Sequence, residues 1–332
     1  MKHPAILGSG SWGTALALLT AQKAPRVTLW GRDPAAADLL NQSRENRRYL
    51  PGIPLPPHLR ATAQFADLAD ADLVLAVVPS TALRQTALNL KASGALRPDA
   101  PLLCCIKGIE LDTGLTMSGV LREIFPHQPL AVLSGPNHAE EVARQLAAAA
   151  VIGSLDPAVS LRLQDFFTLP WFRTYRSTDV TGIEWGGAVK NVFAIASGIC
   201  AGLGLGDNAR AALVTRGLAE MTRLGMAAGG RPQTFQGLSG VGDLIVTCYS
   251  QHSRNNRVGR LLGEGRSLPW ITESLNMVAE GVANTRSIHA AARRFQLRTP
   301  IIDQMFAILY EGKPCAAALT ELLSRDPRAE DE

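Results

Sequence analysis

Residues 4–13 have the sequence PAILGSGSWG, in which a short apolar run precedes a Gly-x-Gly-x-x-Gly motif, and a helical pattern follows over Thr14–Gln22. In such a strand–loop–helix unit, the first glycine permits a tight turn and the second lets the backbone approach a pyrophosphate. The third lets the helix pack closely on the strand, and the helix N-terminus presents N–H groups to the anion. The stretch therefore predicts a dinucleotide-binding unit in which Gly8, Gly10 and Gly13 contact the cofactor.

Short apolar runs alternate with helical patterns through the first half of the chain. The runs are apolar throughout rather than at every second position, which is typical of strands covered on both faces. They lie at Pro4–Leu7, Val27–Trp30, Leu73–Val78, Leu102–Ile106, Leu130–Leu133 and Ala149–Ile152. Between them stand helical patterns at Thr14–Gln22, Pro34–Arg44 and Thr116–Ile124. This alternation predicts an α/β domain with a Rossmann-type, doubly wound and mainly parallel sheet.

The pattern changes after Thr178, because strand signals end and the chain becomes rich in Ala and Leu. Helices are expected at Glu184–Ala201, Ala209–Ala228, Arg257–Leu262, Val282–Phe295 and Ile301–Tyr310. A chain of 332 residues also exceeds the roughly 250–300 residues at which a single core stops growing. We therefore predict a dinucleotide-binding domain over residues 1–179 and an all-helical substrate-binding and catalytic domain over residues 180–332.

The composition excludes several classes of protein. Hydrophobic residues make up 46% of the chain and charged residues 19%, which excludes a disordered protein. The net charge of +4 is mild and spread along the chain, which argues against nucleic-acid binding but permits a local anion site. No apolar run reaches the roughly 18–20 residues of a membrane span. The five cysteines have no metal-ligand spacing, which favours a reducing compartment and no metal.

The N-terminus also resembles a short signal peptide, because Lys2 precedes the apolar residues Ala15–Thr20. The glycines between them fit a strand–turn–helix better, so the sequence predicts a cytoplasmic protein.

The end of the second strand indicates the preferred cofactor. An acidic residue at this position would bind the ribose 2′-hydroxyl of NAD, whereas Arg32 stands there and can pair with the 2′-phosphate of NADP. Asp33 precedes Pro34 and is better explained as the N-cap of the next helix. We expect NADPH to be preferred and NADH to be usable.

Three further clusters contain candidate catalytic and substrate-binding residues. Lys107 follows a strand at the sheet edge where α/β proteins bind ligands. Lys190 and Asn191 interrupt an otherwise apolar helix, so Lys190 either has a pKa lowered by burial or keeps its ammonium in water. Arg254 stands in the run Ser253-Arg254-Asn255, which suits a phosphate, although basic residues in loops are most often only solvated.

Taken together, these motifs resemble those of the bacterial NAD(P)-dependent sn-glycerol-3-phosphate dehydrogenases. The resemblance covers residues from about 4 to about 315 and depends on motifs that occur together and in order. They are Gly8–Gly13, Lys107-Gly108, Ser134-Gly135-Pro136, Gly186–Asn191, Gly202–Asn208, Thr215-Arg216-Gly217, Gly240–Asp243 and Ser253-Arg254-Asn255. The resemblance implies a cytoplasmic homodimer that reduces dihydroxyacetone phosphate to sn-glycerol 3-phosphate with NADPH or NADH, supplying glycerophospholipid synthesis.

The resemblance also implies roles for individual residues. Lys190 matches the catalytic proton-transfer residue and contacts the substrate, and Lys107 matches a contact to both cofactor and substrate. The remaining cofactor contacts are Ser11, Trp12, Arg32, Ala139, Arg254, Val278 and Glu280, beside the glycines of the motif. The remaining substrate contacts are Gly135, Asn137, Asp243, Ser253, Arg254 and Asn255.

This chain departs from the family pattern at three positions. The family usually has Ser or Thr and then Phe after Ser-Gly-Pro, where this chain has Asn137 and His138. We expect the Asn137 amide to donate to the substrate and assign no role to His138. Tyr249 stands where a small residue is common, and it is expected to reshape the loop before Ser253.

Two other functions are compatible with parts of the pattern. A hydroxyacid dehydrogenase or ketopantoate reductase can share the glycine motif and a helical Lys-Asn pair, and its carboxylate substrate would also bind Arg254. A non-catalytic dinucleotide sensor would need neither Lys190 nor the phosphate-binding cluster. Oxidation of NADPH by dihydroxyacetone phosphate distinguishes these functions from the one that the resemblance implies.

Overall fold

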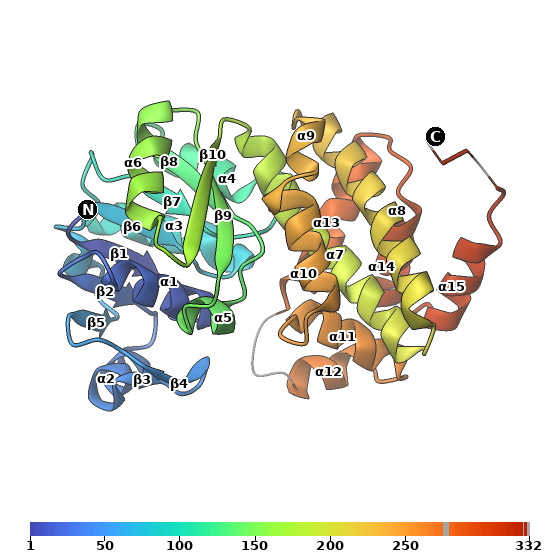
Figure 1. Cartoon of the computed structure of the whole chain (residues 1–332), viewed down its shortest axis with the longest axis horizontal. Helices are drawn as coiled ribbons and strands as arrows, with labels where there is room; N and C mark the ends of the chain where they lie inside the picture. Colours follow the sequence, from blue (N-terminus) through green and yellow to red (C-terminus); the bar gives the residue numbers. More distant parts are fainter. Residues whose placement is uncertain (275–278, 328, 331–332) are drawn as a thin grey trace.

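The computed structural model describes residues 1–274, 279–327 and 329–330. Within them, the N-terminal half is built around an eight-stranded sheet, flanked by helices on both faces (Figure 1). Neighbouring strands pair in parallel, apart from the antiparallel pair of β8 and β9. In spatial order the strands are β10 (Phe172–Ser177), β9 (Ala148–Gly153), β8 (Leu130–Ser134), β7 (Leu102–Cys104), β6 (Leu73–Ala76), β1 (Pro4–Leu7), β2 (Val27–Trp30) and β5 (Leu59–Thr62). The predicted fold class is confirmed.

Alternating residues of the central strands face two separate cores. Ile6 of β1 packs into one core, whereas Ala5 and Leu7 pack into the core on the opposite face of the sheet. Leu75 and Val74 of β6 divide in the same way. Because side chains alternate between the faces of a strand, a strand covered on both sides must be apolar at every position. This explains the continuous apolar runs of the sequence.

The helices of this half connect the strands. Asp33 caps α2, since its carboxylate accepts hydrogen bonds from Ala35 N at 3.0 Å and Ala36 N at 3.3 Å, as expected. The helices are α1 (Ser11–Ala21), α2 (Pro34–Ser43), α3 (Leu83–Ser93), α4 (Met117–Ile124), α5 (Ala139–Ala143) and α6 (Pro157–Phe167), with 3₁₀ turns η1 (Phe65–Leu68) and η2 (Ser80–Ala82). A small hairpin of β3 (Glu45–Asn46) and β4 (Leu50–Pro54) follows α2.

The C-terminal half is helical, with α7 running through its centre (Figure 1). Its elements are α7 (Val180–Gly202), α8 (Gly206–Ala227), α9 (Pro232–Phe235), the π-type turn η3 (Leu238–Gly242), α10 (Asp243–Tyr249), α11 (Arg254–Gly263), α12 (Leu268–Ser274), α13 (Glu280–Arg294), α14 (Pro300–Tyr310) and α15 (Cys315–Leu323). Asp179 caps α7 by accepting from Gly182 N at 2.9 Å. The division between residues 179 and 180 stays a prediction, because Ile183 of α7 packs into a core of the sheet.

No helix of the described residues is long and apolar enough to cross a membrane.

Candidate functional site

The glycine motif forms a tight turn between β1 and α1. Gly8 has a φ of +127°, and a Cβ there would lie 2.6 Å from the Val77 carbonyl oxygen. A Cβ on Gly13 would lie 1.8 Å from the Gly8 carbonyl oxygen, so only glycine permits this packing. A Cβ on Gly10 would meet no atom within 4 Å, and α1 begins there without a side-chain cap. The open space and the N–H groups of the first turn fit the pyrophosphate of a dinucleotide.

The other cofactor candidates surround this loop. Arg32 is exposed beyond β2 and has no hydrogen-bond or ion-pair partner within the described residues, so its guanidinium is available to a 2′-phosphate. Trp12 is half-buried, and Ala139 is buried at the start of α5, which packs against α1. Val278 lies outside the described residues.

A buried carboxylate joins the two predicted lysines. Asp243, at the start of α10, is 1% exposed, and its Oδ2 accepts from Lys107 Nζ at 2.6 Å. Its other oxygen, Oδ1, accepts from Lys190 Nζ of α7. Lys190 Nζ also donates to Thr247 Oγ1 at 2.7 Å. Lys107, Lys190 and Asp243 are therefore brought together, although 136 residues separate Lys107 from Asp243.

Burial and charge set the protonation of this cluster. The pKa of Lys190 is lowered to about 7, chiefly by burial; the charge of Asp243 opposes this shift, and the charge of Lys107 adds to it. Burial disfavours the Asp243 carboxylate, but the two ammonium groups outweigh it and hold the pKa of Asp243 below its usual value. Lys190 therefore combines a proton that it can release near neutral pH with a fixed counter-ion. Of the two alternatives left open by the sequence, the structure has the buried lysine.

Arg254 connects the helical half to the glycine loop. It is the first residue of α11, and its Nη2 lies 3.4 Å from Ser11 Oγ of α1. Ser253 caps α11 by accepting from Asn256 N at 3.2 Å. Asn255 Nδ2 donates to Asn191 Oδ1 at 2.9 Å, which ties α11 to the helix that contains Lys190. The arginine thus lies at the start of a helix rather than in a loop.

Glu280, another predicted cofactor contact, lies where the two halves meet. Its Oε1 accepts from Ser80 N at 3.1 Å and its Oε2 from the Ser80 hydroxyl, so it joins α13 to η2. Burial raises the pKa of Glu280, and the Ser80 bonds and the charge of Arg254 oppose this shift. In this structure both oxygens of the Glu280 carboxylate therefore accept hydrogen bonds from Ser80, and the positive charge of Arg254 also acts on this carboxylate.

The loop after β8 differs from the expectation for Asn137. The Gly135 carbonyl oxygen accepts from Lys107 Nζ at 3.2 Å, which places this predicted residue at the cluster. The Asn137 amide nitrogen, however, donates to the carbonyl oxygens of Pro136 at 3.0 Å and Ala149 at 2.9 Å. Its hydrogens are therefore directed to protein carbonyl groups in this structure, and the expected donation to the substrate stays a prediction. Asn137 Oδ1 is buried and has no hydrogen-bond partner among the residues that the structure describes.

The other two departures from the family pattern are His138 and Tyr249. The His138 ring is half-buried and tilted against the His252 ring, with centroids 5.8 Å apart. Burial, followed by the charge of Lys190, lowers the pKa of His138. The Arg210 guanidinium lies over the Tyr249 ring, 4.5 Å from its centroid.

Sequence reasoning missed Thr247, which accepts from Lys190 and donates to the Asp243 carbonyl oxygen at 2.6 Å. Its position four residues after Asp243 places both side chains on one face of α10. The four-residue spacing from Asp243 is the feature of the sequence that could have identified Thr247.

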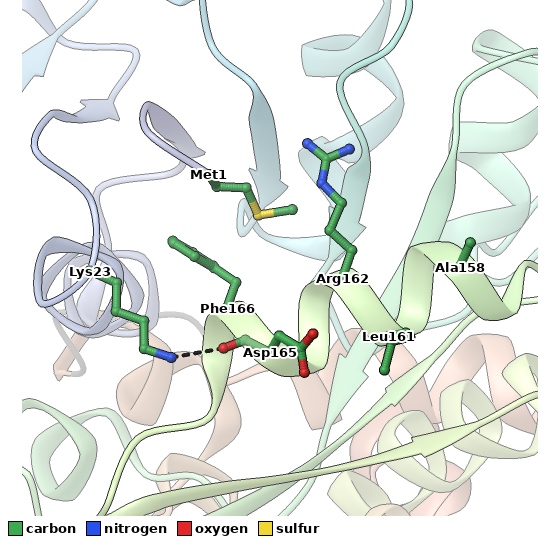
Figure 2. Close-up of a pocket in the computed structure, with 7 residues that line it drawn as sticks. All are labelled: Met1, Lys23, Ala158, Leu161, Arg162, Asp165 and Phe166. Atoms are coloured by element: carbon green, nitrogen blue, oxygen red, sulfur yellow. Dashed lines mark hydrogen bonds between the residues drawn. The ribbon is translucent and has the colours of Figure 1, made fainter.

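A separate surface hollow of about 600 Å³ contains none of these residues. Figure 2 shows it beside α6, where Lys23 Nζ donates to the Asp165 carbonyl oxygen at 2.8 Å. No cluster of three or more His, Cys, Asp or Glu in the described part of the chain is arranged to hold a metal ion.

The fold and the candidate site are those of a dinucleotide-dependent oxidoreductase, with the predicted catalytic residues where a Rossmann-type domain meets a helical one. Family models narrow this class. The model for the N-terminus of NAD-dependent glycerol-3-phosphate dehydrogenase matches residues 4–160, and the model for its C-terminus matches residues 179–320. The chain belongs to this family, as the motifs predicted.

Individual proteins agree with this assignment. A glycerol-3-phosphate dehydrogenase from Carboxydothermus hydrogenoformans, named as using NAD(P)+, is 46% identical over 98% of this chain and 97% of its own. The crystal structure of a glycerol-3-phosphate dehydrogenase from Coxiella burnetii superposes with a TM-score of 0.94 at 38% identity, covering 98% of this chain and 99% of the other. A ketopantoate reductase from Ralstonia eutropha has a TM-score of 0.62 at 17% identity, over 96% of this chain and 99% of its own, and shows only a shared fold.

Proposed function

We propose that this chain interconverts dihydroxyacetone phosphate and sn-glycerol 3-phosphate by hydride transfer with NADPH or NADH. The observation that carries the proposal is the buried ammonium of Lys190, which Asp243 holds beside a second ammonium from Lys107. Ligands of open α/β sheets bind at the carboxyl ends of the strands, and Lys107 follows β7 at that edge. When bound, the cofactor supplies the hydride from its nicotinamide ring.

Lys190 is the proton donor in the direction of reduction. Its ammonium stabilises the negative charge that develops on the carbonyl oxygen and then donates a proton to that oxygen. Asp243 holds the ammonium in place, and Thr247 accepts one of its hydrogens. In the reverse direction the neutral amine removes the proton from the hydroxyl group of glycerol 3-phosphate.

The substrate phosphate binds Lys107 and Arg254. Both are cations from different elements: Lys107 belongs to the cluster, and Arg254 contacts the glycine loop through Ser11. Binding of the phosphate orients the carbonyl group for attack, so a substrate without phosphate loses rate as well as affinity. Gly135, Asp243, Ser253 and Asn255 complete the substrate site, and Glu280 and Ala139 border the cofactor.

The pH dependence follows from the sign of the Lys190 shift. Reduction needs the protonated amine, and burial lowers its pKa to about 7. We therefore expect kcat/KM for dihydroxyacetone phosphate to fall as the pH rises above about 7, and kcat/KM for glycerol 3-phosphate to rise over the same range. The negative charge of the bound phosphate should raise the pKa of Lys190. We therefore expect kcat, which reports the substrate complex, to change at a higher pH than kcat/KM, which reports the free enzyme. The measurement is the initial rate in both directions between about pH 5.5 and about pH 9.5. This range extends roughly two pH units to either side of the expected change. Parallel profiles in the two directions would contradict the role of Lys190.

The exposed position of Arg32 predicts the cofactor preference. Changing Arg32→Asp removes a partner of the 2′-phosphate and adds repulsion, so the KM for NADPH should rise far more than the KM for NADH. Arg176→Asp is the matched control, because Arg176 is also exposed but lies in β10 at the opposite edge of the sheet. Equal changes for both cofactors in Arg32→Asp would remove this residue from the 2′-phosphate site.

The reaction itself is tested with purified protein, NADPH and several keto-substrates. We expect rapid oxidation of NADPH with dihydroxyacetone phosphate and slow oxidation with unphosphorylated dihydroxyacetone. Turnover of ketopantoate but not of dihydroxyacetone phosphate would favour the reductase alternative. Binding of NADPH without turnover of any substrate would favour a sensor.

Three parts of the proposal rest on the family resemblance alone. They are a homodimer, a cytoplasmic location and the supply of glycerol 3-phosphate to glycerophospholipid synthesis. Light scattering of the purified protein tests the first, since a homodimer has twice the chain mass of 35.4 kDa.

A further inference from the structure

Besides Asp243 of α10, a second acidic residue, Glu184, is buried near the site. It lies on α7, six residues before Lys190. Glu184 is 7% exposed, and it reaches across to α4 of the sheet domain. Its Oε1 accepts from Ser118 N at 2.8 Å and its Oε2 accepts from Ser118 Oγ at 2.5 Å. Both carboxylate oxygens are thus held by one buried serine of the other domain.

The Glu184–Ser118 contact caps a helix across the domain boundary. Thr116 is the N-cap residue of α4 and accepts from Gly119 N at 3.3 Å, while Glu184 satisfies the N–H group of Ser118 in the same first turn. Burial raises the pKa of Glu184, and the bonds from Ser118 oppose this shift. Because a buried carboxylate is costly when it loses its hydrogen bonds, sliding or rotation of α7 away from α4 is penalised.

The first turns of α7 continue this contact toward the site. Ile183 packs against Gly153 of β9, where a Cβ on the glycine would lie 2.6 Å from Ile183 Cδ1. Gly187 faces Lys107, and a Cβ there would lie 3.3 Å from Lys107 Cγ. Lys190 follows three residues later. At a rise of about 1.5 Å per residue, Lys190 is only about 9 Å along the helix from Glu184, so the stiff helix transmits any displacement.

We infer that Glu184 is a positioning residue of the reaction, and that the Glu184–Ser118 contact sets the place of the Lys190 ammonium relative to the dinucleotide-binding domain. The cofactor binds one domain and Lys190 belongs to the other, so their separation depends on how α7 is seated. Among the described residues, Glu184 forms hydrogen bonds with Ser118 and forms no hydrogen bond or ion pair with Lys107, Lys190 or Asp243. This inference rests on the proposed function, in which Lys190 donates the proton.

The test compares two substitutions at the same position. Glu184→Ala removes both acceptors, and we expect kcat to fall about 10- to 100-fold, since a displacement of about 1 Å can cost a factor of about 100. The Kd of NADPH, measured by fluorescence titration, should stay within about twofold, because the glycine loop is unchanged. The primary isotope effect with 4-deuterated NADPH should increase as hydride transfer becomes slower. Glu184→Gln should restore most of kcat, because its amide can accept from Ser118 N and donate to Ser118 Oγ.

Glu220 provides a matched control within the same domain. It is 2% exposed and caps α14 by accepting from Ile301 N at 2.9 Å and Ile302 N at 3.2 Å. Its chemistry is that of Glu184, but both partners belong to the helical half. We expect Glu220→Ala to lower Tm by an amount similar to Glu184→Ala while leaving kcat within about threefold of the wild-type value.

Several outcomes separate the inference from the proposed function. If Glu184→Ala is folded and keeps kcat within threefold, or if Glu220→Ala lowers kcat equally, Glu184 has only a structural role. If Glu184→Ala fails to fold, Ser118→Ala replaces it, since this variant removes only the hydroxyl donor and should still lower kcat severalfold with an increased isotope effect. An unchanged kcat in folded Ser118→Ala would then overturn the inference. A wild-type protein that fails to turn over dihydroxyacetone phosphate would instead overturn the proposed function.

Discussion

Changing Lys190→Met is expected to lower kcat by at least about 100-fold, the lower part of the range for loss of general acid catalysis. Methionine keeps the length and the apolar stem of the side chain but removes the charge and the proton. Asp243 keeps its 2.6 Å contact with Lys107, so the buried carboxylate is not left without a counter-ion and the variant should fold. NADPH should still bind, because the glycine loop and Arg32 are unchanged.

Steady-state kinetics and NADPH fluorescence titration on one preparation measure both halves of this prediction. The residual activity of Lys190→Met should also lose the limb near pH 7 that the wild-type lysine produces. Lys91→Met serves as the control, since Lys91 is exposed on α3 and lies outside the site. If Lys190→Met turns over within a fewfold of the wild type, Lys190 is a structural lysine and Lys107 becomes the next candidate for the proton donor.

The sequence predicted the centre of the sheet better than its edges. The apolar runs at Pro4–Leu7 and Val27–Trp30 coincide with β1 and β2, and the other predicted runs overlap β6 to β9. The strands of this sheet that were missed, β5 and β10, are its two edge strands, and the separate β3–β4 hairpin was missed as well. In β10 the exposed Arg173 lies between the buried Phe172 and Thr174, and the exposed Tyr175 follows Thr174. A search for continuous apolar runs finds strands covered on both faces and misses edge strands, because edge strands retain polar positions.

Residue types predicted the site, but contacts between distant residues did not follow from the sequence. Lys107, Lys190 and Asp243 were each selected by their motif, yet nothing in the chain indicated that Asp243 bonds to both lysines. The burial of Lys190, which lowers its pKa, depends on the packing of the helices around α7 and was open at that stage. The sequence also contained no sign that the Asn137 amide donates to carbonyl groups of the protein, one of them on Ala149 of the neighbouring strand.

Changing Arg254→Gln is expected to lower kcat/KM for dihydroxyacetone phosphate. The loss of transition-state stabilisation should be roughly 2–5 kcal/mol, the range for losing one partner of a buried charge pair. Unphosphorylated dihydroxyacetone should be nearly insensitive, because it has no group for the guanidinium to bind. The structure adds a complication, since Arg254 Nη2 lies 3.4 Å from Ser11 Oγ of the glycine loop. Ser11→Ala removes that hydroxyl while keeping the arginine, so its effect on the KM for NADPH measures the contribution of the contact to cofactor binding.

Arg257→Gln is the matched control for the charge, because Arg257 is exposed one turn further along α11. It removes the same charge from the same helix and should change kcat/KM less than about threefold, as expected for a solvated side chain. A loss confined to the phosphorylated substrate in Arg254→Gln, absent from both Ser11→Ala and Arg257→Gln, places the substrate phosphate at Arg254. If both substrates lose activity equally in Arg254→Gln, the arginine acts on the cofactor or on the packing of α11, and Lys107 is then the principal phosphate ligand.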